Sequence, residues 1–226
     1  VVDELVEGVS VFGGVCCDTP VGGVNPAAVE TALALGAKLV WLPTLTSRQD
    51  YLSGVAAKLG LPGPGISVVD AEGRLTPETQ EVLALVADHG AVLATGHVST
   101  EEHFAVARAA RRRCQLLVTH ATEELAGPNL SVEACRELAE LGAYVELCAM
   151  TCIGALATRQ PAELAACAAA VGPARCTLAT DFGQAANPRP ADGFQAFADA
   201  LVEAGLSPAE VRTMACENPC RLLGIG

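Results

Sequence analysis

The chain has 226 residues, 51% of them hydrophobic, and a formal net charge of −12 at pH 7. This length suits one substantial core, and an acidic surface repels phosphate backbones, so we expect no nucleic-acid partner. No apolar run reaches the roughly 18 residues that a membrane span requires. The N-terminal segment has no basic residue and no signal-type core. We therefore expect a cytoplasmic protein that contacts no membrane.

Strand and helix patterns alternate along the chain. Asn25 followed by Pro26, and the capping box from Ser99 to Glu102, mark two helix starts. The expected order is strand 9–12, helix 26–36, strand 38–42, helix 76–88, strand 91–97, helix from 99, strand 115–120, helix 131–142, strand 143–148, helix from 161, strand 175–181, and helices from about 191 and 208.

One region interrupts this alternation. Residues around 61–76 predict a small hairpin insertion that turns at Glu72 and Gly73. The glycine- and proline-rich run at its start does not join a strand to a helix, so we do not interpret it as a nucleotide-binding loop.

Six strand–helix units predict a parallel sheet with right-handed crossovers. A closed (β/α)8 TIM barrel has eight such units and typically about 250 residues. We expect residues 1–226 to form a single, N-terminally incomplete TIM-barrel-like domain that lacks the first two units; the alternative is an open sheet. Either arrangement leaves two exposed edges, so we expect a homo-oligomer that covers them.

Three of the expected strands end in a metal-binding type of residue: His97, His120 and Asp181. The carboxyl ends of parallel strands lie at one edge of the sheet, where the loops converge. Imidazole and carboxylate groups suit zinc and related divalent ions, so these three residues predict a metal site. The remaining histidines, His89 and His103, lie at a helix end and within a helix, and we expect both at the surface.

Polar residues near these strand ends are candidates for substrate binding. Glu146 lies in an otherwise apolar strand, where a buried charge needs a partner or a metal; a structural ion pair is the alternative. Gln184, Asn187 and Arg189 follow Asp181 in a loop and have groups that bind a carboxylate or amide oxygen. For Arg189, a plain surface position is the slightly favoured interpretation.

The ten cysteines lack the paired C-x-x-C spacing of structural zinc sites. Several lie in apolar strand patterns, where a thiol behaves as a small hydrophobe. We expect reduced thiols, as in the cytoplasm. A metal-free hydrolase that uses Cys148 or Cys152 beside His120 is one further hypothesis.

The chain resembles the amidohydrolase superfamily in four segments: Thr-Gly-His97, Val-Thr-His120, Ala-Thr-Asp181-Phe-Gly and the ending Asn218-Pro-Cys-Arg-Leu-Leu-Gly224. The segments Val-Gly-Gly-Val-Asn-Pro26 and Asp-Phe-Gly-Gln184 are similar to an amidohydrolase-like family of uncharacterised bacterial proteins. The resemblance implies a (β/α)8 barrel with one or two divalent metals, held by His97 and His120. It also implies that Asp181 binds metal and accepts the proton of the attacking water.

The chain departs from that superfamily in two respects. It has no His-x-His pair, and Lys38 begins its strand where a bridging lysine would end one. We interpret the chain as a metal-dependent hydrolase, with zinc as the expected ion, that attacks a C–N or C–O bond of a small-molecule substrate. The superfamily also admits decarboxylation and isomerisation. The alternative is a non-enzymatic barrel that binds a small molecule or serves in assembly and has a degenerate metal site.

Overall fold

The structure is a computed structural model that describes residue 8 and residues 10–61 and 63–225. Its strands are β1 (Gly14–Cys16), β2 (Leu39–Trp41), β3 (Val92–Ala94), β4 (Gln115–Val118), β5 (Tyr144–Cys148) and β6 (Cys176–Ala179). Its α-helices are α2 (Pro26–Ala34), α3 (Arg48–Leu52), α4 (Val55–Lys58), α5 (Pro77–Asp88), α6 (Thr100–Ala110), α7 (Val132–Glu140), α8 (Pro161–Val171), α9 (Pro190–Glu203), α10 (Pro208–Arg212) and α11 (Asn218–Leu223). Short 3-10 turns are η1 (Thr19–Val21), η2 (Ala149–Thr151) and η3 (Pro173–Arg175), and η4 (Thr213–Glu217) is a π-helical turn.

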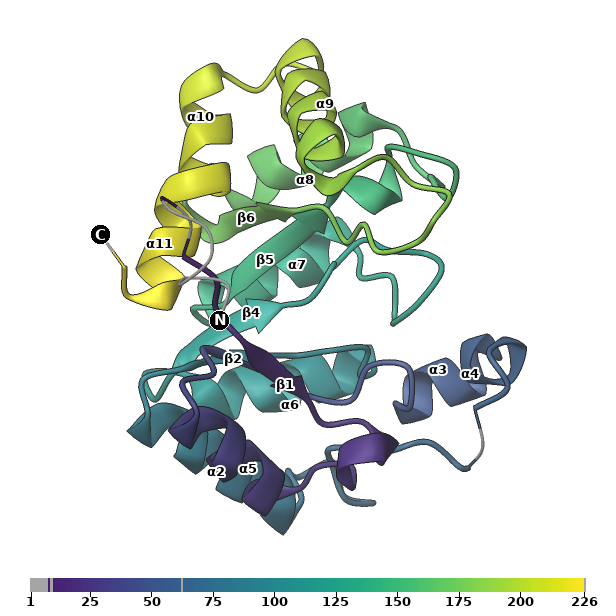
Figure 1. Cartoon of the computed structure of the whole chain (residues 1–226), viewed down its shortest axis with the longest axis vertical. Coiled ribbons are helices and arrows are strands. Elements are labelled where there is room, and N and C mark those ends of the chain that lie inside the picture. Colours follow the sequence, from purple (N-terminus) through teal and green to yellow (C-terminus); the bar gives the residue numbers. More distant parts are fainter. Residues whose placement is uncertain (1–7, 9, 62, 226) are drawn as a thin grey trace.

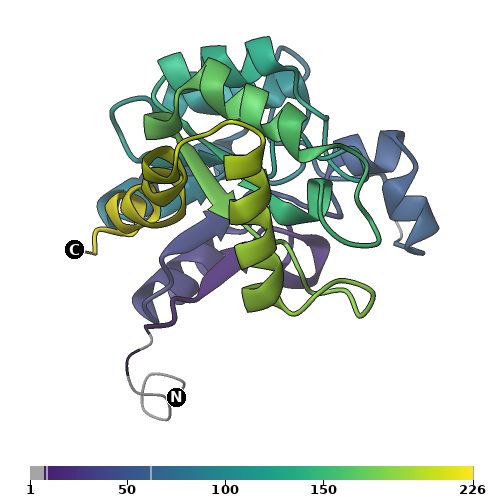
Figure 2. The same ribbon diagram turned by 90° about the horizontal axis from the view of Figure 1, so that it is seen from above.

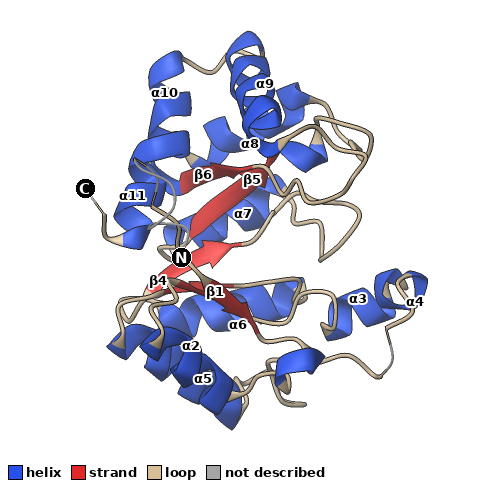
Figure 3. Cartoon of the chain, viewed as in Figure 1, coloured by secondary structure: helices blue, strands red, loops and turns tan. Residues whose placement is uncertain are grey.

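The strands form one sheet in the order β1-β2-β3-β4-β5-β6, and every neighbouring pair is parallel. This sequential order confirms the predicted partial TIM barrel, because each strand–helix unit adds a strand beside the previous one. Most helices lie around the outside of the sheet (Figures 1 and 3), whereas α11 packs against part of its inner face. The two edges of the sheet are β1 and β6. Both views in Figures 1 and 2 show α3 and α4 projecting from the body on the side away from α11.

Side chains alternate between the two faces of the sheet. The outer face packs against the helices in the main core, where Leu93, Val118 and Val145 contact helix residues such as Val106 and Leu138. The inner face carries a smaller apolar cluster of Val92, Ala94, Leu117 and Tyr144, which Leu222 of α11 covers. Glu146 lies two residues after Tyr144 and therefore also belongs to the inner face, which is the interior of a TIM barrel.

The predicted helix starts are confirmed. The side chain of Asn25 accepts hydrogen bonds from the backbone N–H groups of Ala27 and Ala28 at the start of α2. Ser99 and Glu102 form the complete capping box of α6. Such caps satisfy backbone donors that have no partner within the helix, which is why these motifs are reliable local signals.

The first strand is not where the sequence pattern places it. Residues 10–12 are not in a strand, residue 9 lies outside the described residues, and β1 begins at Gly14. Gly14 pairs with Leu39, and a Cβ atom at this position would lie 2.3 Å from the ring of Trp41. The register therefore requires glycine in the strand, whereas strand propensity favours the apolar run before it.

The insertion between β2 and α5 is larger than the predicted hairpin. Within the predicted hairpin the chain makes a small turn in which Val69 bridges Leu75 and the N–H of Gly73 bonds to the carbonyl of Asp70. Before it, α3 and α4 occupy residues for which the sequence pattern predicts no helix.

The prediction that His103 lies at the surface is wrong. Its side chain is fully buried on the face of α6 that also buries Val106, Ala107 and Ala110. Its Nδ1 atom lies 2.9 Å from the carbonyl of Ser99, and its Nε2 atom has no hydrogen-bond partner among the described residues. Burial lowers the pKa of His103 to about 4. His89 is exposed, as predicted.

The Asn-Pro-Cys-Arg-Leu-Leu-Gly ending attaches the last helix to the sheet. The side chain of Asn218 is buried and donates to the carbonyls of Pro173 and Cys176, at 2.8 and 2.7 Å. Arg221 donates to the Oδ1 atom of Asn218. These residues fix α11 against the start of β6 and lie away from the carboxyl ends of the strands.

Candidate functional site

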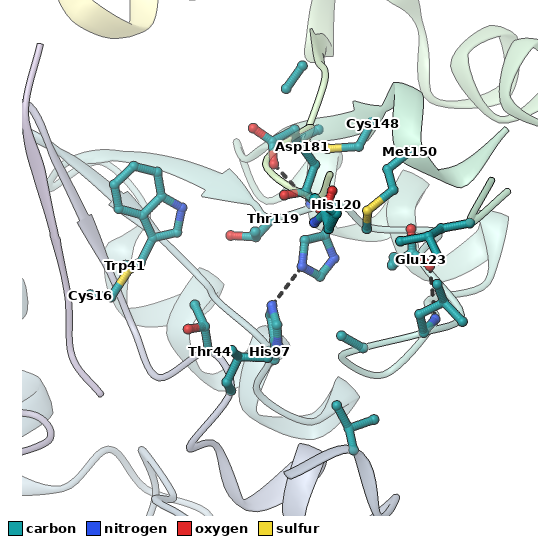
Figure 4. Close-up of a pocket in the computed structure, with 18 of the residues that line it drawn as sticks. Cys16, Trp41, Thr44, His97, Thr119, His120, Glu123, Cys148, Met150 and Asp181 are labelled. Carbon is teal, nitrogen blue, oxygen red and sulfur yellow. Dashed lines mark hydrogen bonds between the residues drawn. The ribbon is translucent and has the colours of Figure 1, made fainter. Parts of the chain in front are cut away.

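A cavity of about 690 Å³ opens where the strands end. Its wall includes Cys16, Trp41, Cys148 and Ala179, the last residues of four strands. His97, His120 and Asp181 all line it, so the structure brings the three predicted metal ligands to one cavity. Figure 4 shows the two histidines facing each other between Trp41 on one side and Glu123 on the other.

The two histidines meet through their Nε2 atoms, which lie 2.8 Å apart. The ring centroids are 4.6 Å apart and the ring planes are inclined by 60°. Both side chains are largely buried. Burial, and then the neighbouring His97, lower the pKa of His120 to about 3, so its imidazole is neutral at pH 7 and keeps a nitrogen lone pair available.

The position before His97 requires glycine, because the backbone there approaches another strand end closely. The backbone of Gly96 has a positive φ of 63°, and a Cβ atom there would lie 2.3 Å from the carbonyl oxygen of Leu42. The chain can therefore pass close to the end of β2, where the N–H of His97 donates to the carbonyl of Pro43 at 2.9 Å.

Asp50 is a site residue that the sequence analysis missed. It lies in α3, is fully buried, and its Oδ2 atom is 2.5 Å from Nδ1 of His97. Its other oxygen accepts the N–H of Gly127 at 2.8 Å. Since a carboxylate accepts hydrogen bonds, Nδ1 of His97 donates to Asp50, and Nε2 is the ring nitrogen that faces His120.

Glu146 lies beneath His120. Its Oε2 atom accepts the N–H of His120 at 3.1 Å, and its side chain lines the cavity; its substrate-binding role stays a prediction. Desolvation is the main reason why the pKa of Glu146 rises to about 7, and the charge of Asp181 adds to it. His120 itself has a φ of 27°, an unusual backbone conformation for a residue other than glycine.

Asp181, like His120, has a positive backbone φ, in this case 54°. Partial burial, followed by the negative charge of Glu123, raises the pKa of Asp181. Glu123 is a second residue that the sequence analysis missed: it is buried, lines the cavity, and accepts the N–H groups of Glu124 and Leu125 at 2.9 Å each. These bonds hold the loop after His120 in place.

Of the three predicted substrate-binding residues in the loop after Asp181, only one lines the cavity. Gln184 lines the cavity, and its Oε1 atom accepts a hydrogen bond of 2.7 Å from Asn187. Asn187 and Arg189 are not part of the cavity wall. Asn187 therefore positions Gln184, and the substrate-binding roles of all three residues stay predictions.

The cysteine hypothesis finds little support. Cys148 does line the cavity with His120. However, burial and the surrounding carboxylates of Glu146, Asp181 and Glu123 raise its pKa well above the ordinary value, and burial raises the pKa of Cys152 to about 12. A protonated thiol is a poor nucleophile.

The residues fit a divalent ion in part. The Nε2 atoms of His97 and His120 converge, and Asp50 fixes the tautomer that a metal ligand needs. Two histidine nitrogens on one tetrahedral zinc ion lie about 3.3 Å apart. The 2.8 Å contact between the two Nε2 atoms would therefore have to widen to admit an ion. Within residues 8, 10–61 and 63–225, no group of three His, Cys, Asp or Glu side chains is arranged to hold a metal. Asp181 lines the same cavity and is the third candidate.

A family model matches residues 1–146, a segment that contains His97, His120 and Glu146. The chain belongs to the family of unknown function DUF6282. Asp181 lies beyond the match of this DUF6282 chain. Comparison with curated proteins found no similar sequence.

Three solved structures share the fold of the DUF6282 chain. An amidohydrolase from Pseudomonas aeruginosa has a TM-score of 0.62 and 18% identity over 88% of this chain and 67% of that protein. A metallo peptidase from Rhodobacter sphaeroides, solved with a phosphinate mimic of the dipeptide L-Ala-D-Ala, has a TM-score of 0.61 and 19% identity, over 89% of this chain and 59% of that protein. A zinc-bound amidohydrolase from Burkholderia multivorans has a TM-score of 0.53 and 16% identity, over 95% of this chain and 84% of that protein.

These structures confirm, for the fold, the resemblance to the amidohydrolase superfamily. The six parallel strands of the DUF6282 chain correspond to part of the TIM barrel, and the chain spans 59% of the length of the metallo peptidase. No helix in the described part of the chain is long and apolar enough to span a bilayer.

Proposed function

We propose that the protein is a metal-dependent hydrolase that cleaves a C–N or C–O bond of a small molecule. The observation that carries this proposal is the convergence of two imidazole rings at a cavity, with the buried Asp50 behind one of them. His97 and His120 would hold the ion, zinc being the expected one, and Asp181 would complete the set. A bound divalent ion supplies Lewis acidity, which polarises a carbonyl group and makes water more acidic.

The residues of the chain divide the remaining tasks. Asp50 holds His97 in one tautomer and one orientation. Asp181, with its raised pKa, is a stronger base than an ordinary aspartate and accepts the proton of the attacking water. Glu146, with a pKa of about 7, holds or releases a proton on the floor of the cavity. Gln184 is available to bind a polar group of the substrate.

Zinc binding and hydrolysis test this proposal together. The purified chain is loaded with zinc, dialysed and assayed against a panel of N-acyl amino acids, simple amides and lactones. We expect tightly held zinc, hydrolysis of at least one class, and loss of both in His97→Ala. Asp181→Asn should lose activity more than it loses zinc. A chain that holds zinc no better than His97→Ala contradicts the proposal.

A binding protein without catalysis is the second candidate. It is favoured by one observation, namely that no three described His, Cys, Asp or Glu side chains are arranged to hold a metal. In that case the same cavity takes up a small molecule, and the histidine pair is a hydrogen-bonded remnant. Ligand uptake without zinc retention or turnover would distinguish this candidate.

We also propose that the protein works in the cytoplasm as a homo-oligomer. The support for self-association is that β1 and β6 have a strand neighbour on one side only within the described part of the chain. Sedimentation of the purified chain tests it, since a monomer at micromolar concentration would contradict it.

A further inference from the structure

The cavity has an apolar mouth. Leu45, Leu59 and Leu125 line it and are 39%, 56% and 42% exposed, while Val55 and Leu156 continue the same wall. A small-molecule site typically has a cavity of about 300–1,000 Å³ with mostly apolar walls and a few polar groups. At about 690 Å³, this cavity has room for an apolar group beside the histidine pair.

The wall of the cavity contains one positively charged side chain among the described residues. Lys58, at the end of α4, is the only lysine or arginine among the described residues that line the cavity. Its side chain is exposed, and no ion pair or hydrogen bond is found for its ammonium group in the described part of the chain. Arg159, by contrast, is engaged with Glu124 and Glu163.

The segment that carries Lys58 is fixed to the site. Asp50 of α3 bonds to His97 and to Gly127, as described above. The hydroxyl of Tyr51 donates to the carbonyl of Leu61 at 2.7 Å, which closes the segment behind α4. The wall is therefore already formed, so a ligand does not have to order it on binding.

We propose that the cavity binds a small organic anion with an apolar body, whose anionic group contacts Lys58. The apolar body lies against Leu45, Val55 and Leu59, and the end of the ligand away from Lys58 faces His97 and His120. The carboxylates of Glu146 and Asp181 favour this direction, because they repel an anionic group at the inner end of the cavity. The proposal rests on the proposed function only in taking this cavity as the place where the substrate binds.

The single tryptophan of the chain reports on binding, since Trp41 lines the cavity. The chain is treated with EDTA, so that no ion competes for the ligand, and its tryptophan emission is followed during titration with three matched probes. These are 4-phenylbutyrate, 4-phenylbutyramide and 4-phenylbutylamine, which share the phenylalkyl skeleton and have an anionic, an uncharged and a cationic end group. We expect the anion to bind about fivefold more tightly than the amide, and the amine to bind most weakly.

Lys58→Gln should remove this preference and leave the affinity for the amide unchanged. Lys38→Gln is the matched control, because Lys38 is the only other lysine and precedes β2 at the far end of the strand. Leu59→Asn should weaken all three probes about fivefold, whereas Leu52→Asn should not, since Leu52 is exposed but lies outside the cavity. Equal binding of the three probes, or tighter binding of the amine, overturns the proposal.

The outcomes separate this proposal from the proposed function. A chain that binds zinc and hydrolyses amides but shows no preference for the anion contradicts the present inference alone. A chain that prefers the anion through Lys58 but retains no zinc contradicts the proposed function alone.

Discussion

Nδ1 of His97 lies 2.5 Å from Oδ2 of Asp50, although the two residues are 47 positions apart in the sequence. The pair joins the insertion after β2 to the end of β3. It also aims Nε2 of His97 at Nε2 of His120. The orientation of the candidate metal ligand therefore depends on a buried carboxylate that belongs to a different segment of the chain.

Asp50→Asn is expected to weaken zinc binding by about 10- to 100-fold, because an amide can hold either tautomer of His97 and no longer raises its basicity. Competition with a chromophoric chelator measures the affinity. Asp88→Asn is the matched control, since Asp88 is exposed at the end of α5. Equal zinc affinities of the two variants would show that Asp50 does not act through the metal ligand.

His120→Ala should lose zinc after dialysis, while His89→Ala should keep it. His120 provides one of the two converging nitrogens, and His89 is exposed on a helix end. Elemental analysis of both variants side by side measures the metal content. His103→Ala should also keep zinc, and a loss of metal in all three variants would point to unfolding and contradict a specific role of His120.

His103 should make the metal-free protein less stable in acid. Its pKa is about 4 in the folded chain, below the ordinary value of 6.5, so the unfolded chain binds the proton more tightly. The free energy of unfolding has its full value above pH 6.5 and falls as the pH drops toward 4. At pH 5 the loss is about 2 kcal/mol. Urea unfolding at pH 7 and pH 5 measures the loss.

His103→Leu removes this titrating group, so its free energy of unfolding should fall by about 2 kcal/mol less between the two pH values than that of the unmodified chain. His89→Leu should leave the pH dependence unchanged, because His89 is exposed. Parallel behaviour of His103→Leu and the unmodified chain would refute the assignment.

Gly14→Ala should destabilise the chain by about 2 kcal/mol, because the added methyl group meets the Trp41 ring at 2.3 Å and the carbonyl of Leu39 at 2.8 Å. Gly13→Ala is the neighbouring control, with no atom within 4 Å of the added group. Urea unfolding followed by the emission of Trp41 compares the two variants. Similar stabilities would mean that the register of β1 differs from the one described.

The sequence by itself determined the fold class and the location of three site residues. Apolar runs that end in His97, His120 and Asp181 indicate parallel strands, and such strands bring their carboxyl ends to one edge of the sheet whatever the exact register. Helix caps at Asn25 and Ser99 are equally local, because a few adjacent residues satisfy their hydrogen bonds. These features needed no knowledge of distant contacts.

Only the tertiary structure decided which residues support those ligands. Asp50 lies in the five-residue helix α3, which is too short for a periodic pattern, and Glu123 lies in a loop. Their roles depend on partners elsewhere in the chain or on backbone groups of a particular loop. His103 was misplaced because a helix pattern does not state how wide its buried face is. The start of β1 depends on the space left by the Trp41 ring at Gly14. Burial, register and paired charges arise from contacts between distant segments, so local sequence patterns do not contain them.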